Sequence, residues 1–295
     1  MAVLGVKVDT DFSAATSRVW LVTGCSSGLG RALCQRVLET GDRVVVTARN
    51  TASIADLVAE YPGHALPLTL DVTDPGSIAA AVDQAVARAG RIDVLVNNAG
   101  YGIVGALEEI DETEGQRVFD ANVFGTYRVI RALLPHMRGR HAGHILNISS
   151  MGGLVAGAGF AFYNATKFAV EGMSEALALE VAPFGIKVTI VEPGPFRTDF
   201  RSRSMYSAPP MDAYAETVGC FRKAMAETDG KQPGDPRRAA DAMIAAVNAA
   251  EPPLHLPLGE ICVQAIRRKL FSVGQEIDRW EAVSLATSFL PAAAT

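Results

Sequence analysis

The residues best suited to chemistry are a tyrosine and a lysine four positions apart, Tyr163 and Lys167, with Ser150 thirteen residues before the tyrosine. The stretch around them is apolar and predicts a helix, on which positions four apart share a face. A lysine ammonium on that face favours phenolate over phenol, so we expect it to lower the pKa of Tyr163 from about 10 toward neutrality. Ser150 could donate a hydrogen bond to the same reacting oxygen. Because a surface tyrosine often has a lysine one turn later, this spacing alone does not define a site.

A second segment has the order of a nucleotide-binding turn. An apolar run over 19–22 predicts a buried strand, and Gly24, Gly28 and Gly30 then lead into a helix over 31–38. Gly24 would permit a sharp turn, Gly28 would let the backbone approach a ligand, and Gly30 would let the helix pack on its strand. The helix N-terminus would offer free N–H groups and a positive dipole end to a pyrophosphate. Glycines can form a tight turn without a ligand, but this order favours dinucleotide binding.

Together with other motifs, these segments resemble the short-chain dehydrogenase/reductase family. The motifs occur in the family's order over roughly residues 18–200: Thr23-Gly24-xxx-Gly28-x-Gly30, Asn97-Asn98-Ala99-Gly100, Asn122, Ser150, Tyr163-xxx-Lys167 and Pro193-Gly194. The glycine spacing is that of the compact branch, and the turn resembles hydroxysteroid and retinol dehydrogenase-like members. The resemblance implies a Rossmann fold and an NAD(P)(H)-dependent oxidoreductase that interconverts a carbonyl and an alcohol by hydride transfer.

The resemblance also implies a set of site residues. Catalysis would rest on Asn122, Ser150, Tyr163 and Lys167. Tyr163 would exchange a proton with the substrate oxygen and Ser150 would polarise the carbonyl. Lys167 would also bond the nicotinamide ribose, and Asn122 would bind a water that links Lys167 to solvent. The cofactor would contact Gly24, Ser26, Ser27, Gly28, Leu29, Gly30, Arg49, Asp71, Val72, Asn98, Ala99, Gly100, Tyr163, Lys167, Pro193, Gly194 and Thr198.

For two of these residues, Asp71 and Asn122, the position in a predicted strand or helix also suggests a role. In the family, the residue matching Asp71 contacts adenine, but the end of a predicted strand is equally suited to capping the next helix, with Asp74 nearby. Asn122 lies inside a predicted helix, where asparagine is unfavourable, and this favours a buried polar role.

The choice of cofactor depends on the end of the second predicted strand. A site selective for NAD usually has Asp or Glu there to bond the ribose 2′-hydroxyl, whereas a cation accommodates the 2′-phosphate. This chain has Ala48, Arg49 and Asn50 instead, with no carboxylate. A guanidinium suits phosphate, so we expect NADP(H) rather than NAD(H), with NAD(H) still possible. Arg49 could instead pair with a surface acid.

Short β-branched runs alternate with helical segments, which predicts an α/β fold with one doubly wound parallel sheet. The predicted strands are 19–22, 43–48, 65–70, 92–97, 144–149, 187–191 and, as an edge strand containing a proline, 254–258. The predicted helices are 31–38, 74–89, 113–137, one from Tyr163 to 181, 237–249 and 261–285. We expect an N-terminal extension over 1–17 and a single domain over 18–295. That domain would include a substrate loop over about 195–230 and a C-terminal extension with helices from about 231.

Composition excludes several other classes of protein. The 295 residues are 49% apolar and 20% charged with a net charge of −5, so we expect no nucleic-acid partner. The four cysteines lack disulfide or zinc spacing, the histidines form no metal signature, and Cys25 is more readily a small filler than a nucleophile. The chain lacks a signal-like start and a membrane-length apolar run, so we expect a cytoplasmic protein.

The substrate is less well defined. The apolar stretch over 151–162 either lines the site, favouring an apolar or bulky carbonyl compound, or packs beneath it. A second wall should come from 198–229, where Arg197, Arg201 and Arg203 could meet an anion but are more readily solvated. The C-terminal helix could cover the site or form a subunit contact. The family commonly forms homodimers or homotetramers. The alternatives to a dehydrogenase are an idle NADP(H)-sensing protein, which should have lost Tyr163 or Lys167, and an epimerase or dehydratase.

Overall fold

A computed structural model describes residues 17–289, so all but the last residue of the predicted N-terminal extension lies outside the described residues. Seven parallel strands form the central sheet in the order β3-β2-β1-β4-β6-β7-β9. They are β1 Val19–Val22, β2 Arg43–Ala48, β3 Ala65–Thr69, β4 Val94–Asn97, β6 Gly143–Ile148, β7 Ile186–Pro193 and β9 His255–Leu258. The strand order reverses between β1 and β4, where a doubly wound sheet opens its ligand crevice. The predicted fold is confirmed.

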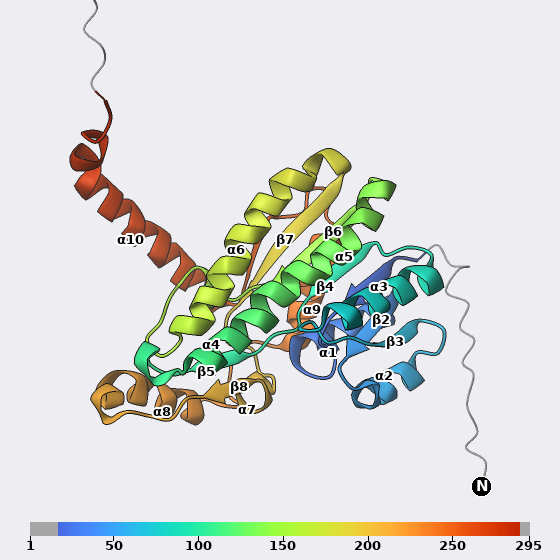
Figure 1. The fold of residues 1–295 in the computed structure, drawn as a ribbon, viewed down its shortest axis with the longest axis horizontal. Helices are drawn as coiled ribbons and strands as arrows, with labels where there is room; N and C mark the ends of the chain where they lie inside the picture. The colour runs from blue at the N-terminus through green and yellow to red at the C-terminus, as the bar shows by residue number, and fades with distance from the viewer. Residues whose placement is uncertain (1–16, 290–295) are drawn as a thin grey trace, which may run out of the picture.

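Helices cover both faces of the sheet (Figure 1). One face carries α1 Gly28–Glu39 and α9 Pro236–Asn248, and the other carries α3 Pro75–Ala89, α5 Gly125–Arg140 and α6 Ala161–Val181. Because side chains alternate along a strand, β1 contributes side chains to the core on both faces of the sheet. Trp20 and Val22 pack in the α1 and α9 layer, whereas Val19 and Leu21 pack in the other.

The long helix predicted over 113–137 contains a break in its regular spacing. It consists of α4 Glu112–Phe119, a π-helical turn over Asp120–Phe124, and then α5. A π-helical turn inserts one residue into a helix, and such turns are frequent at functional sites. Asn122 lies within this turn and is buried.

The predicted substrate loop over 195–230 is only partly a loop. It contains α7 Phe200–Arg203, β8 Met205–Ser207, a π-helical turn over Ala215–Gly219 and α8 Cys220–Glu227. Strand β8 pairs in parallel with β5 Gly102–Val104, and α7, β8 and α8 lie together at one end of the molecule (Figure 1). The sequence did not indicate β5, β8 or the short helix α2 Ala55–Glu60, because each is too brief to show a period.

The predicted extension from 231 begins inside the main domain. Helix α9 belongs to the core, and β9 pairs with β7 as the predicted edge strand. Helix α10 Glu260–Leu285 buries Cys262, Ala265 and Ile266 and then projects away from the body (Figure 1). Over residues 17–289, no helix combines the length and the apolar character needed to cross a bilayer.

Candidate active site

A cavity of about 930 Å³ opens at the carboxyl ends of the central strands. Its walls include Ser150, Tyr163 and Lys167 and every predicted cofactor-contacting residue except Gly30. Asn122 is also absent from its walls. The fold thus brings together residues from β1, β2, β4, β6, α6 and β7 that are far apart in the sequence.

The glycine turn after β1 is built around Asn98. Its side-chain amide donates hydrogen bonds of 2.9 Å to the carbonyl oxygens of Thr23 and Gly24. A Cβ on Gly30 would lie 2.3 Å from that amide nitrogen, so Gly30 permits a close contact, although with the Asn98 side chain rather than with the strand as predicted. Gly24 has a φ of +71°, which agrees with the predicted sharp turn.

The N-terminus of α1 faces this cavity through Ser27, Gly28 and Leu29. Ser27 makes no capping bond with its side chain, and the first turn contains no acidic residue. A Cβ on Gly28 would come no closer than 3.9 Å to Thr198, so open space lies above the turn. Free backbone donors, a positive helix end and open space fit the pyrophosphate of a dinucleotide.

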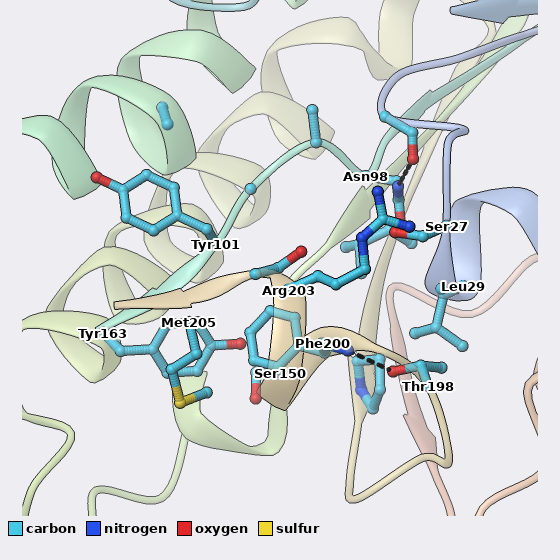
Figure 2. A pocket seen from close by; sticks show the side chains of 18 of the residues that line it. Ser27, Leu29, Asn98, Tyr101, Ser150, Tyr163, Thr198, Phe200, Arg203 and Met205 are labelled. Carbon is cyan, nitrogen blue, oxygen red and sulfur yellow. Dashed lines mark hydrogen bonds between the residues drawn. The ribbon is translucent and has the colours of Figure 1, made fainter. Parts of the chain in front are cut away.

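Tyr163 and Ser150 face each other inside the cavity (Figure 2). The Tyr163 ring is 8% exposed and lies 5.4 Å from the Phe160 ring and 6.0 Å from the Phe200 ring between centroids. This burial raises the pKa of Tyr163 to about 12, although a hydrogen bond with Ser150 opposes the shift. The Ser150 hydroxyl accepts from the Gly152 amide at 3.0 Å, which leaves its proton available for another acceptor.

The expected lowering of the Tyr163 pKa is therefore wrong for this structure. The Lys167 ammonium lies 5.8 Å from the centre of the Tyr163 ring and donates to the Ile148 carbonyl at 2.8 Å. Its charge is directed at the end of β6 rather than at the phenol oxygen, and burial of the ring dominates. Burial also lowers the pKa of Lys167 to about 8, with the charge of Glu171 opposing.

Asn122 lies behind the cavity wall, where its side chain bonds to protein groups. Its amide oxygen accepts from the Tyr101 N–H at 3.0 Å, and its nitrogen donates to the Tyr101 carbonyl at 2.9 Å and to the Thr166 hydroxyl at 3.1 Å. These bonds tie the π-helical turn to α6 next to Lys167. The buried polar role expected of Asn122 is present, and a link through water to Lys167 remains a prediction.

Asp71 follows β3 and Arg49 follows β2. The sequence left open whether Asp71 caps a helix and whether Arg49 pairs with a surface acid, and the structure shows neither arrangement in the part of the chain that it describes. Asp74 caps α3, whereas Asp71 accepts bonds from the Thr73 N–H and hydroxyl and lines the cavity. Burial raises the pKa of Asp71, but these bonds and the charge of Arg49 hold it below its usual value. Within residues 17–289, Arg49 forms no ion pair with a surface acid, and it lines the cavity. Asn50 caps the turn that follows β2.

The rest of the cavity is largely apolar. From the predicted first wall, Met151 and Phe160 line it, whereas Phe162 packs toward Gly115 and Phe119 instead. The second wall contributes Phe200, Met205, Tyr206, Phe221 and Met225. Arg201 also lines the cavity but donates to the Met225 carbonyl and the Thr228 hydroxyl, which agrees with a structural role.

The sequence did not reveal a buried acidic cluster beneath the site. Glu171 on α6, Glu192 on β7 and His255 on β9 bring ligand atoms within 4.8 Å of one another. His255 Nδ1 lies 2.7 Å from Glu192, and burial raises the pKa of both glutamates, that of Glu171 to about 7. The one sequence feature that could have indicated this cluster is Glu171, a glutamate one turn after Lys167 on a helix face that was predicted to be buried.

Known proteins agree with this architecture and site, which are those of a dinucleotide-binding oxidoreductase. A family described as short chain dehydrogenase matches residues 18–207, so the chain belongs to the short-chain dehydrogenases/reductases. Oxidoreductase BOA17 of Botryotinia fuckeliana is 36% identical over 92% of this chain and 100% of its own. The 3-ketodihydrosphingosine reductase of Bacteroides thetaiotaomicron is 39% identical over 83% and 88%. Human retinol dehydrogenase 8 is 36% identical over 82% and 81%.

Solved structures show the same fold. A short-chain dehydrogenase from Streptomyces avermitilis is 49% identical with a TM-score of 0.88, over 93% of this chain and 100% of that one. ElxO with NADP bound is 27% identical with a TM-score of 0.69, over 81% and 96%. A 3-ketoacyl-(acyl-carrier-protein) reductase from Brucella melitensis with NADH is 27% identical with a TM-score of 0.66, over 79% and 90%. Relatives thus bind either nicotinamide dinucleotide.

Proposed function

We propose that this protein is an NADP(H)-dependent reductase of bulky, apolar carbonyl compounds. The observation that carries the proposal is the facing pair of Tyr163 and Ser150 at the inner end of the dinucleotide cavity. A phenol whose pKa is about 12 keeps its proton at neutral pH, and a proton donor is what reduction of a carbonyl requires. An idle sensing protein would not need this pair.

The cofactor fits the residues present, since the α1 turn would hold its pyrophosphate and its nicotinamide would supply a hydride. Tyr163 would donate its proton to the substrate oxygen as negative charge develops there. Ser150 would aim its hydroxyl at the same oxygen, a donor fixed in advance by the Gly152 amide. Lys167, held by the Ile148 carbonyl, would keep a positive charge beside this centre.

The substrate class follows from the lining and from relatives. Aromatic and methionine side chains form the second wall, and such walls favour apolar ligands. Retinol and 3-ketodihydrosphingosine, named in two relatives, are long apolar compounds. Preference for NADP(H) rests on Arg49, which lines the cavity at the end of β2 where an NAD-selective site would have a carboxylate.

The test is NADPH oxidation by the purified protein with a panel of apolar ketones and aldehydes. Tyr163→Phe should lower turnover about 10²–10⁴-fold while NADPH still binds, because only the proton donor is lost. Tyr101→Phe removes a hydroxyl from the same cavity and should cost less than about tenfold. Near-normal turnover by Tyr163→Phe would exclude the mechanism. Tight NADPH binding without turnover on any substrate, in either direction, would support the sensing alternative.

A further inference from the structure

Two buried carboxylates, those of Glu171 and Glu192, lie outside the cofactor cavity and lack partners for most of their oxygens. The two residues are 3% and 0% exposed. Within residues 17–289, neither side-chain oxygen of Glu171 takes part in a hydrogen bond, and Glu192 uses only one of its two, toward His255. Buried carboxylate oxygens without a partner are costly, so these atoms need one. The cavity is lined by other residues of the described chain, so the cofactor does not supply it.

The fold directs these carboxylates and the His255 imidazole to one point. His255 lies opposite Ile190 in the pairing of β7 with β9, and Glu192 follows Ile190 by two residues, so both side chains leave the same face of the sheet. Helix α6 covers that face and brings Glu171 to it (Figure 1). Because the three residues come from three separate elements, no local metal signature in the sequence predicts their meeting.

The distances between these side chains fit the ligands of one small cation. His255 Nδ1 lies 2.7 Å from Glu192 Oε1 and 3.8 Å from Glu171 Oε2. Ligands that lie about 2.0–2.2 Å from one Zn²⁺ are separated by roughly 3–4 Å. Burial raises the pKa of Glu171 and the nearby Ser149 hydroxyl opposes this shift, although the two groups form no hydrogen bond of normal geometry. A cation between the carboxylates would supply the missing partner.

We propose that Glu171, Glu192 and the Nδ1 atom of His255 bind one divalent cation, with Zn²⁺ preferred to Mn²⁺ and Mg²⁺. One imidazole with two carboxylates suits zinc, whereas Mg²⁺ is usually held by oxygen ligands and keeps several waters. Three protein ligands leave a fourth position of a tetrahedral ion for water. We call these three residues the Glu–Glu–His site.

Glu175 supports this assignment from outside the site. It lies one turn after Glu171 on α6, and its Oε1 atom is 3.7 Å from His255 Nε2. A histidine that binds a metal commonly directs its second ring nitrogen at a carboxylate, which fixes the ring proton on that nitrogen. Here the proton would be held on Nε2, and Nδ1 would be free to bind the ion.

Access and charge also favour a cation. The side chains of His255 and Glu175 are 39% and 52% exposed, so an ion can reach the site from solvent without passing through the cofactor cavity. The ammonium of Lys167 lies close enough for its pKa to be affected by the charge of Glu171, although burial is the larger influence. A divalent ion and Lys167 together carry three positive charges, which balance those of Glu171, Glu175 and Glu192.

Calorimetric titration of ZnCl₂ into chelator-treated protein without an affinity tag, at about pH 7.5, tests the site. We expect one tightly bound Zn²⁺ per chain, with weaker binding of Mn²⁺ and Mg²⁺. Loss of an outer partner of a ligand typically weakens metal binding about 10–100-fold, so Glu175→Gln should raise the Kd about tenfold and His255→Gln at least about 100-fold. Glu180→Gln removes an exposed carboxylate from the same helix and should change the Kd less than about twofold.

Thermal unfolding gives a second readout, because an ion that binds only the native state raises the Tm. Zn²⁺ should raise the Tm of the wild type and of Glu180→Gln but not that of His255→Gln. NADPH binding and the circular dichroism spectrum of His255→Gln should match those of the wild type, because His255 lies outside the cofactor cavity.

A wild type that binds no Zn²⁺ would overturn the proposal, and so would a His255→Gln variant that binds it equally well. If His255→Gln does not fold, Glu175→Gln decides, because its side chain is half-exposed and binds no ion itself; an unchanged Kd for that variant would then overturn the proposal. None of these outcomes bears on the proposed reductase, whose test is turnover with NADPH.

Discussion

Lys167 and Glu171 lie one turn apart on α6, and both side chains are buried, at 8% and 3% exposure. Burial lowers the pKa of Lys167 to about 8, and the negative charge of Glu171 opposes that shift. Burial raises the pKa of Glu171 to about 7. Between these values both groups are ionised, so the glutamate helps to keep the lysine charged at the pH where the enzyme would work.

We therefore expect the kcat/KM of carbonyl reduction to fall as the pH rises through about 8, where Lys167 loses its proton. Glu171→Gln removes the opposing charge, so the pKa of Lys167 should decrease and the fall should begin at lower pH. Glu175→Gln is the control, because Glu175 is half-exposed and does not act on Lys167. Superimposable profiles for Glu171→Gln and the wild type would contradict the coupling.

The same glutamate makes stability depend on pH. Its ordinary pKa is 4.5 and its pKa in the native state is about 7, so the native state keeps a proton that the unfolded chain has lost. The free energy of unfolding should therefore fall as the pH rises from about 4.5 to about 7. Glu192, whose pKa is also raised by burial, adds in the same direction, while the charge of His255 opposes both shifts.

Glu171→Gln should remove this penalty. At pH 8 the variant should be more stable than the wild type by roughly 2–3 kcal/mol, and at about pH 4.5 the two should be nearly equal. Urea denaturation at both pH values measures the difference. Glu175→Gln should show no such dependence, and a Glu171→Gln variant that is less stable at pH 8 would show that the carboxylate is stabilising.

The sequence predicted the sheet and most of the site because both leave local signals. Each central strand is a short apolar run between helical segments, and Tyr163 and Lys167 are close in the sequence. Gly24 and Gly30 could be assigned their roles because a turn and a close packing contact require glycine.

What the sequence did not predict depends on contacts between distant segments. Strands β5 and β8 are three residues each and pair with each other across about 100 residues of chain, so neither could be recognised from its own sequence. His255 meets Glu192 across 63 residues, so no local spacing could reveal their pairing. The expected pKa of Tyr163 was wrong because helical spacing placed Lys167 nearby but could not show its bond to the Ile148 carbonyl.

Gly30→Ala should disrupt the cofactor turn. Its Cβ would lie 2.3 Å from the Asn98 amide nitrogen and 2.5 Å from the Gly24 carbonyl oxygen, so the two hydrogen bonds of that amide could not both persist. We expect a loss of about 2–4 kcal/mol in the free energy of unfolding and a higher Kd for NADPH. Urea denaturation and fluorescence titration measure the two effects.

Gly139→Ala is the matched control for Gly30→Ala. Gly139 lies in α5 with nothing within 4 Å of an added Cβ, so alanine should stabilise the protein by about 0.5–1 kcal/mol. NADPH binding should be unchanged. Equal effects of the two substitutions would mean that the close contact between Gly30 and Asn98 has no energetic importance.

Arg49 should decide between the two nicotinamide cofactors. It lines the cavity at the end of β2, and no residue of the described chain holds it in an ion pair. Its guanidinium can therefore bond a 2′-phosphate, so Arg49→Gln should raise the KM for NADPH roughly tenfold or more and leave that for NADH nearly unchanged. Arg31→Gln is the control, because Arg31 is a cation near the same turn whose guanidinium pairs with Asp56. If the wild type uses NADH as well as NADPH and Arg49→Gln alters both KM values equally, Arg49 does not bind the 2′-phosphate selectively.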